Sequence, residues 1–136
     1  PNSMNYHQTQ IRVRYSETDQ MRVVYHGNYA QYFEIGRVEW LRNQGISYKW
    51  MEENGIMLPV VSLTMNYKKS ARYDELLTLK TFLKKMSTVK IEFDYELYNE
   101  KEELLTTGNS ILVFVDMKTG KPTSPPQYIS DILNRV

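Results

Sequence analysis

The 136 residues include 17 basic and 16 acidic side chains, a formal charge of +1. This balance argues against nucleic acid as the main partner, which usually needs a concentrated basic face. The chain has no cysteine, which excludes disulfides, thiolate catalysis and Cys-bound metals, and no apolar run approaches the roughly 20 residues of a membrane span.

With 41% apolar and 24% charged residues, the composition is that of an ordinary globular protein, and the length suits one hydrophobic core. We therefore expect a single domain over residues 1–136, without membrane insertion. The start of the chain lacks a signal-peptide core, so the expected location is the cytoplasm. Pro1 to Ser3 are open to interpretation as a cloning remnant ahead of Met4.

Alternating apolar and polar residues predict a first strand from Thr9 to Tyr15, followed by a loop from Ser16 to Gly27. A helix is expected from Asn28 to Asn43. Asn28 suits the N-cap, Gln31 completes a box-like arrangement, and Gly45 stands just past the end.

This predicted helix is apolar on several sides, which indicates that most of it is buried. One of its stripes contains a glycine, Gly36, which would let another segment approach closely. The members of this stripe are Tyr29, Tyr32, Phe33, Gly36 and Trp40. A second, shorter helix is expected from Ser47 to Asn54, ending at Gly55.

After Gly55 the apolar period changes from 3.6 to 2, which predicts strands. Four runs are expected, at Val61–Tyr67, Leu77–Leu83, Val89–Leu97 and about Leu104–Val115. The last run is apolar on both faces towards its end, which predicts a central place in the sheet. The connections after the second and third runs are short enough for hairpins, Gly120 marks a turn, and Gln127–Asn134 predicts a terminal helix.

The order of these elements predicts an α+β fold in which one long buried helix is wrapped by a five-stranded antiparallel sheet. Such a sheet covers only one side of the helix. We therefore expect subunits to pair, which would bury the remainder.

Several well-known catalytic motifs are absent from the sequence. It contains no G-x-S-x-G elbow, no G-x-x-x-x-G-K-S/T loop, no G-x-G-x-x-G and no H-E-x-x-H. The two histidines are His7 and His26, and their spacing suggests no metal site. A serine hydrolase is hard to build, because its base would have to be one of these two, and no cofactor is expected.

The loop that leads into the predicted helix carries a carboxylate, Asp19, and an imidazole, His26, among several tyrosines. Unpaired N–H groups at a helix start stabilise a developing oxyanion, by about 3 to 4 kcal/mol per donor in known cases. A carboxylate in the preceding loop could activate water or attack a carbonyl carbon. Simpler interpretations remain open: Asp19 as a turn former, His26 as a surface residue, and Tyr25, Tyr29 and Tyr32 as core.

The stretch from Tyr15 to Tyr29 resembles the active-site segment of the 4-hydroxybenzoyl-CoA thioesterase family, which has the hotdog fold. Within that family it is similar to the bacterial acyl-CoA thioesterases associated with the Tol-Pal envelope system. Later residues fit as well, including Pro59-Val60-Val61-Ser62. The matching positions of the segment are Tyr15, Glu17, Thr18, Asp19, Val24, Tyr25, His26, Asn28 and Tyr29.

The resemblance implies hydrolysis of an acyl-CoA thioester, with Asp19 as nucleophile or general base. His26 would polarise the carbonyl through its backbone N–H, and in the closer subgroup its side chain is implicated too. The remaining implied substrate contacts are Tyr15, Tyr25, Asn28, Tyr29 and Glu34, with Lys68, Lys69 and Arg72 as candidates for the phosphates of coenzyme A. The resemblance also implies a glycine three residues after Asp19, where this chain has Arg22.

The resemblance also implies an active site built between two subunits, in a homodimer or homotetramer. Acyl carrier protein is an alternative carrier of the acyl group, and a non-catalytic acyl-CoA-binding hotdog module is an alternative function. A dehydratase would pair His26 with Glu34 or Glu39 but lacks the expected H-F-P segment. The nature of the acyl group cannot be read from the sequence.

Overall fold

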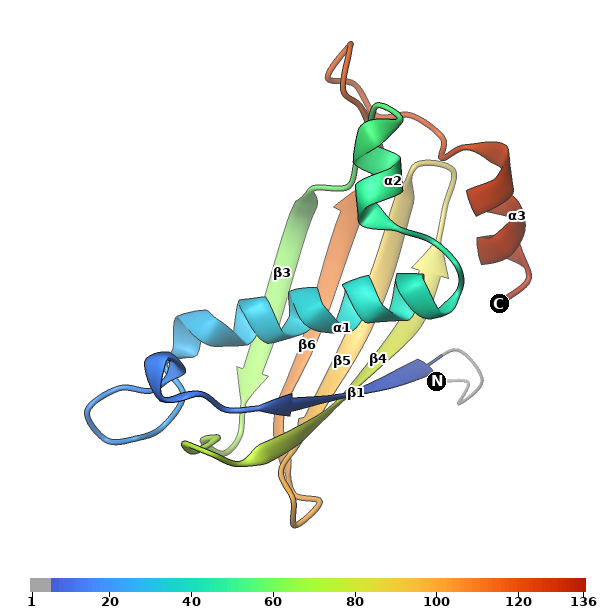
Figure 1. The fold of residues 1–136 in the computed structure, drawn as a ribbon. Coiled ribbons are helices and arrows are strands. Elements are labelled where there is room, and N and C mark those ends of the chain that lie inside the picture. The colour runs from blue at the N-terminus through green and yellow to red at the C-terminus, as the bar shows by residue number, and fades with distance from the viewer. Residues whose placement is uncertain (1–5) are drawn as a thin grey trace.

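The structure is a computed structural model that describes residues 6–136, so Pro1 to Ser3 lie outside the described residues. A five-stranded antiparallel sheet, in the order β1-β4-β5-β6-β3, forms one layer, and helix α1 crosses one of its faces (Figure 1). The strands of this sheet are β1 (Tyr6–Arg12), β3 (Val60–Tyr67), β4 (Leu76–Met86), β5 (Lys90–Tyr98) and β6 (Leu104–Val113). The helices are α1 (Tyr29–Asn43), α2 (Tyr48–Glu53) and α3 (Gln127–Asn134), and the short strands β2 (Ile56–Met57) and β7 (Val115–Asp116) pair with each other. The expected α+β architecture is confirmed.

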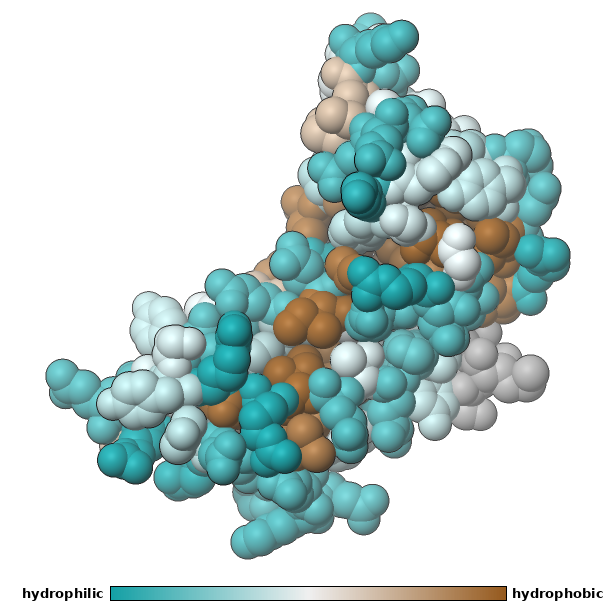
Figure 2. All heavy atoms as spheres, viewed as in Figure 1, coloured by the Kyte–Doolittle hydropathy of each residue, from teal (hydrophilic) through white to brown (hydrophobic). Residues whose placement is uncertain are grey.

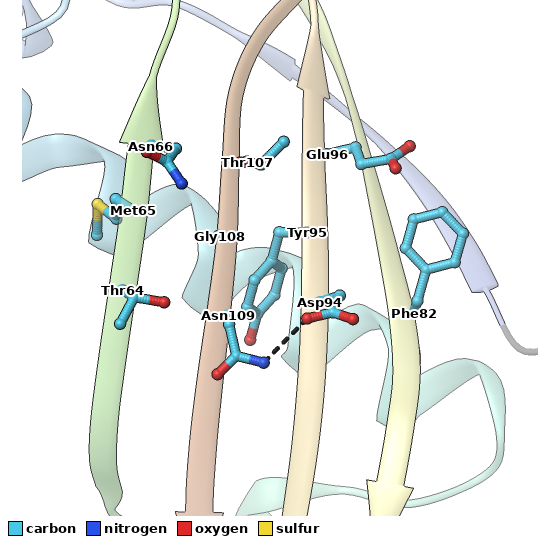
Figure 3. Close-up of a pocket in the computed structure, with 10 residues that line it drawn as sticks. All are labelled: Thr64, Met65, Asn66, Phe82, Asp94, Tyr95, Glu96, Thr107, Gly108 and Asn109. Atoms are coloured by element: carbon cyan, nitrogen blue, oxygen red, sulfur yellow. Dashed lines mark hydrogen bonds between the residues drawn. The ribbon is translucent and has the colours of Figure 1, made fainter. Parts of the chain in front are cut away.

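Strand β5 explains how the sheet separates its two faces. Its alternate residues from Ile91 to Leu97 are fully buried towards α1, whereas the residues between them remain partly exposed. Figure 3 views the sheet from the side opposite α1: Tyr95 reaches behind the sheet towards the helix, and Asp94 and Glu96 stay on the near face. Because alternate side chains of a strand point to opposite faces, the alternation of apolar and polar residues in the sequence gives the sheet one core face and one polar face.

Helix α1 lies close to the sheet because glycines make room for it. A Cβ at Gly36 would lie 2.4 Å from Oγ1 of Thr81, and one at Gly108 on β6 would lie 2.4 Å from the ring of Phe33. The ring of Phe33 in turn stacks on Tyr95, with 4.4 Å between ring centroids. The close approach expected at Gly36 is confirmed.

Most predicted elements occur where the sequence placed them. Ser47 caps α2 by accepting a hydrogen bond from the N–H of Trp50, and Gly45, Gly55 and Gly120 adopt the positive φ angles that suit glycine at helix ends and turns. Helix α3 has the predicted bounds. The β4–β5 and β5–β6 connections are hairpins.

Two predictions about strands were wrong. The first strand runs from Tyr6 to Arg12 rather than from Thr9 to Tyr15, because the chain turns into a 3-10 turn at Tyr15–Glu17. Strand β6 is interior but not central, since β5 occupies the middle of the sheet and β6 lies between β5 and the edge strand β3.

The two edge strands differ in the side chains that they expose. Strand β1 exposes Gln8, Gln10 and one aromatic residue, Tyr6 at 37%, whereas β3 exposes the aliphatic residues Val61 at 57% and Leu63 at 39%. Figure 2 shows apolar residues on the face that carries α1 and along the β3 side of the molecule. Among residues 6–136, no helix is long and apolar enough to cross a bilayer.

Candidate active site

Asp19 opens a tight hairpin just before α1. Its N–H donates to the carbonyl of Val23 at 2.9 Å, and its carbonyl accepts from the N–H of Arg22 at 3.0 Å. Oδ1 of Asp19 accepts a third bond, 2.8 Å long, from the N–H of Met21. The carboxylate is exposed, and Oδ2 has no hydrogen-bond partner within residues 6–136. The hairpin thus holds one carboxylate oxygen and leaves the other available.

Arg22 occupies the left-handed position that closes this hairpin, with φ of +61°. Three-residue hairpin loops commonly place a glycine there. The glycine in the family pattern therefore meets a backbone requirement, which Arg22 fulfils at a cost of about 1 to 2 kcal/mol. The loop remains compact despite the substitution.

Glu17, which the sequence matched but to which no role was assigned, anchors the loop to the helix. Glu17 is 7% exposed, and its carboxylate accepts bonds from the N–H of Arg14 at 2.8 Å, Nε of Arg14 at 3.0 Å and the hydroxyl of Tyr32 at 2.9 Å. Burial alone would raise the pKa of Glu17, but these bonds and the Arg14 charge together hold it below its usual value. Burial and the Glu17 carboxylate raise the pKa of Tyr32.

The chain enters α1 through a 3-10 turn, His26–Asn28. The N–H groups of His26 and Gly27 start this turn and have no acceptor among the hydrogen bonds of residues 6–136. Asn28 is the N-cap residue of α1, as predicted, but its side chain forms no capping hydrogen bond. Instead, Nδ2 of Asn28 donates a 2.8 Å bond to the carbonyl of Glu17, which ties the helix start to the loop.

A cavity of about 120 Å³ adjoins this helix start. The ring of His26 stacks on Tyr67, with 4.4 Å between centroids and an interplanar angle of 16°. Tyr29 is buried, and its hydroxyl accepts a 3.2 Å bond from the N–H of Ala71. The residues that line the cavity are His26, Tyr29, Tyr67, Lys68, Lys69 and Ser70.

A second cavity, of about 330 Å³, shares Lys69 and Ser70 with the first and extends to Arg72 and Lys101. Lys69 forms an ion pair with Glu103, which also lines this cavity. Lys68, by contrast, has no ion-pair partner within the described part of the chain. The structure therefore brings Lys68, Lys69 and Arg72 next to the helix start.

Other predicted site residues are not brought together within one chain. Tyr15 is exposed, with its ring edge-on to Tyr73 at 5.7 Å, and Tyr25 is also exposed. Glu34 lies on the exposed side of α1, and neither Glu34 nor Asp19 lines the two cavities at the helix start. Residues 6–136 contain no cluster of three side chains suited to a metal ion.

A further hollow, of about 300 Å³, lies on the sheet face opposite α1 (Figure 3). Asn109 donates there to Asp94 at 2.9 Å and to Glu92 at 2.8 Å. None of the predicted site residues lines this hollow. It is therefore separate from the candidate site.

The family model of the thioesterase-like superfamily matches residues 13–133. A DHNA-CoA thioesterase from Staphylococcus aureus is 43% identical, with a TM-score of 0.89 over 95% of this chain and 87% of that one. The hypothetical protein TT1821 from Thermus thermophilus is 34% identical, with a TM-score of 0.89 over 94% and 97% of the two chains. The acyl-CoA thioester hydrolase YbgC of Escherichia coli O6:H1 is 30% identical over 119 residues, which are 88% of this chain and 89% of that protein. The chain thus belongs to the thioesterase-like superfamily and is a thioester hydrolase with the hotdog fold.

Proposed function

We propose that this protein hydrolyses acyl-CoA thioesters, with Asp19 as the catalytic carboxylate and the start of α1 as the oxyanion site. The observation that supports this most directly is the pair of unpaired N–H groups at His26 and Gly27, one hairpin away from Asp19. Such donors stabilise the negative charge that develops on a thioester oxygen during attack.

The chemistry needs one carboxylate and one water molecule. In one route, Asp19 takes a proton from a water molecule while the water oxygen bonds to the thioester carbon. In the other, the Asp19 carboxylate attacks that carbon itself and forms an anhydride, which water then cleaves. The carbonyl electrons move to the oxygen at the His26 and Gly27 N–H groups. When they return, the C–S bond breaks, and the thiolate of coenzyme A takes up the proton that Asp19 removed from water, or a proton from solvent if Asp19 attacked directly.

The two adjoining cavities provide a path for coenzyme A. They connect the helix start to Lys68, Lys69 and Arg72 through the shared residues Lys69 and Ser70. Cationic side chains along this path would bind the phosphates. Since Lys69 already pairs with Glu103, Lys68 and Arg72 are the stronger candidates for these contacts.

The exposed positions of Asp19 and Glu34 support a site completed by a second subunit. Glu34 lies on the exposed side of α1, and the neighbouring Ile35 is 40% exposed. Strand β3 offers an unpaired edge with apolar side chains. We therefore place the partner along β3 and over this side of α1, in a homodimer or a pair of dimers.

The acyl group is suggested by a relative. The S. aureus protein at 43% identity is a DHNA-CoA thioesterase, so an aromatic acyl group is a candidate substrate beside aliphatic ones. Another relative is an acyl-acyl carrier protein thioesterase, 29% identical over 65% of its length. Thioesters of acyl carrier protein are therefore candidate substrates as well. The single-domain organisation and cytoplasmic location stay predictions.

The test is thiol release from a panel of aromatic and aliphatic acyl-CoAs and from acyl carrier protein thioesters. We expect turnover of at least one acyl-CoA, which falls at least about 100-fold in Asp19→Asn. Asn keeps the oxygen that binds Met21, so the hairpin remains intact. Exposed Asp131 in α3 provides the control, Asp131→Asn, which should retain activity. Hydrolysis of carrier-protein thioesters alone would reassign the substrate, and no turnover of any thioester would refute the proposal.

A further inference from the structure

Arg37, in the middle of α1, has a buried charge without a counterion among residues 6–136. It is 7% exposed, and it forms no ion pair with any carboxylate of residues 6–136. A guanidinium cannot lose its proton in a protein, and burying an unpaired ion costs several kcal/mol. The position therefore favours an additional acceptor from outside the chain.

The surroundings of Arg37 are phenols rather than carboxylates. Its guanidinium lies against Tyr48 of α2 and Tyr95 of β5. Tyr95 shares a 2.6 Å hydrogen bond with Ser110, so its hydroxyl has a partner. Nε of Arg37 and the hydroxyl of Tyr48, however, both lack a well-formed hydrogen bond within residues 6–136. The phenols thus contact the guanidinium without giving Nε of Arg37 or the Tyr48 hydroxyl a bond of ordinary geometry, which is rare for buried polar groups.

Tyr48 connects this pair to an apolar cavity. The cavity has a volume of about 230 Å³ and lies between α2 and the segment around β2, with Met51, Ile56 and Leu58 among its lining residues. Glu52 also lines it, but Glu52 is exposed. An apolar pocket with a few convergent polar groups is the usual form of a small-molecule site.

The location suits the far end of an acyl group. Arg37 follows Asn28 by nine residues, which is about 14 Å along the helix at 1.5 Å per residue. Glu34 lies one turn closer to the helix start. An acyl chain or a fused aromatic ring that runs along α1 from the oxyanion site would approach Arg37 with the part most distant from the thioester.

We infer that Arg37 and Tyr48 select acyl-CoAs whose acyl group carries an oxygen acceptor remote from the thioester, either a carboxylate or an aromatic hydroxyl. This inference rests on the proposed acyl-CoA hydrolysis. A buried site whose polar groups bond to an oxygen of the substrate binds an analogue without that oxygen less tightly, because the polar groups of the protein then remain unpaired.

The test measures binding, so that it does not depend on turnover. The probes are ketone analogues of acyl-CoAs, in which a methylene replaces the thioester sulfur, in two matched pairs. Suberoyl against octanoyl analogues test the carboxylate, and 6-hydroxy-2-naphthoyl against 2-naphthoyl analogues test the aromatic hydroxyl. Calorimetry gives the affinity ratio within each pair for the wild type and for Arg37→Met and Tyr48→Phe.

We expect the oxygenated member of at least one pair to bind tenfold or more tightly to the wild type, and that pair identifies the source of the oxygen. Both variants should reduce this ratio to within about threefold of one. Arg42→Met, which removes an exposed guanidinium from the last turn of α1, should keep the wild-type ratio. Tyr48→Phe decides the question if Arg37→Met does not fold.

Two results would overturn the inference. One is a wild-type ratio near one in both pairs. The other is an affinity ratio that stays the same in Tyr48→Phe and in a folded Arg37→Met. If Arg37→Met then also dissociates the oligomer, Arg37 serves the subunit interface instead. Failure of hydrolysis with intact binding selectivity would count against the proposed function alone.

Discussion

The hydroxyl of Tyr32, one turn into α1, donates a 2.9 Å hydrogen bond to the buried carboxylate of Glu17, two residues before Asp19. Asn28 adds a second tie, from its side chain to the carbonyl of Glu17. The loop that carries Asp19 is therefore fixed to the same helix whose start presents the unpaired N–H groups. Glu17 and Tyr32 act as positioning residues, since they hold Asp19 at a set place relative to those donors.

Glu17→Gln should lower the free energy of unfolding at pH 7 by about 1 to 3 kcal/mol, because the amide cannot accept all the bonds of the carboxylate. The pKa of Glu17 is lower in the folded chain than in the unfolded one. Its stabilisation is therefore present above the ordinary glutamate pKa of about 4.3 and is lost as the pH falls through the folded value. Urea unfolding from pH 7 to pH 3 should show the wild type and Glu17→Gln converging in acid. A constant difference across this range would contradict the assignment.

Tyr32→Phe should reduce turnover while the chain stays folded, because the Asp19 loop loses one of its ties to α1. The matched control is Tyr98→Phe, which deletes a similar 2.8 Å bond to Glu96 on the sheet. That variant should retain the wild-type activity. The readout is kcat in the thiol-release assay together with the melting temperature. Equal activity of the two variants would assign Tyr32 a purely structural role.

His26→Ala should cost less activity than Asp19→Asn. The contribution proposed for His26 is a backbone N–H, which alanine keeps, whereas Asp19→Asn removes the carboxylate itself. The stacking of the His26 ring on Tyr67 would be lost, with an effect expected mainly on KM. Steady-state kinetics of both variants with the same acyl-CoA provide the comparison. If both lose activity equally, the imidazole takes part in the chemistry.

Arg22→Gly should stabilise the protein by about 1 kcal/mol, because glycine adopts the left-handed φ of +61° without the clash of a Cβ. Arg22→Ala separates backbone from charge, since alanine keeps the strain and removes the guanidinium. We expect the melting temperature to rise in the glycine variant and to stay unchanged in the alanine variant. Similar gains in both would point to charge repulsion at Arg22 instead of backbone strain.

Periodicity was enough to predict α1 and the four later strands, since the core-facing residues of each recur at the spacing of its element. The sequence did not reveal the order of the strands, because pairing between distant segments determines that β5 rather than β6 is central. The end of β1 was also missed. The bonds between Glu17 and Arg14 turn the chain at Tyr15, where alternation alone predicts a continued strand.

At the site, the residues that resemble a family motif were found, but the bonds by which they support one another were not. Asn28 has the side chain of a helix cap, but its own backbone is already helical and its NH2 group donates to the carbonyl of Glu17, which only the folded loop places nearby. Arg37 follows Tyr29 and Phe33 at intervals of four on the buried side of α1. An arginine at that spacing indicates a buried charge. It was overlooked because the predicted stripe was defined by apolar residues alone.

The working unit should be at least a dimer, formed along β3. Within residues 6–136 this strand pairs with β6 alone, which leaves backbone groups free along its other edge, and it exposes Val61 and Leu63 beside them. The opposite edge strand, β1, exposes glutamines and is a poorer surface for association. Leu63→Lys should therefore yield a folded monomer with little activity, because charges on an edge strand oppose pairing.

Gln10→Lys is the matched control, since it places the same charge on the other edge strand and should leave the oligomer and its turnover intact. Sedimentation velocity at micromolar concentration, followed by the thiol-release assay on each species, gives both readouts. The site needs the partner if activity follows the dimer fraction across a dilution series. A Leu63→Lys monomer with full turnover would show that one chain supplies the whole site, and Asp19 and Glu34 would then have to act without the second subunit.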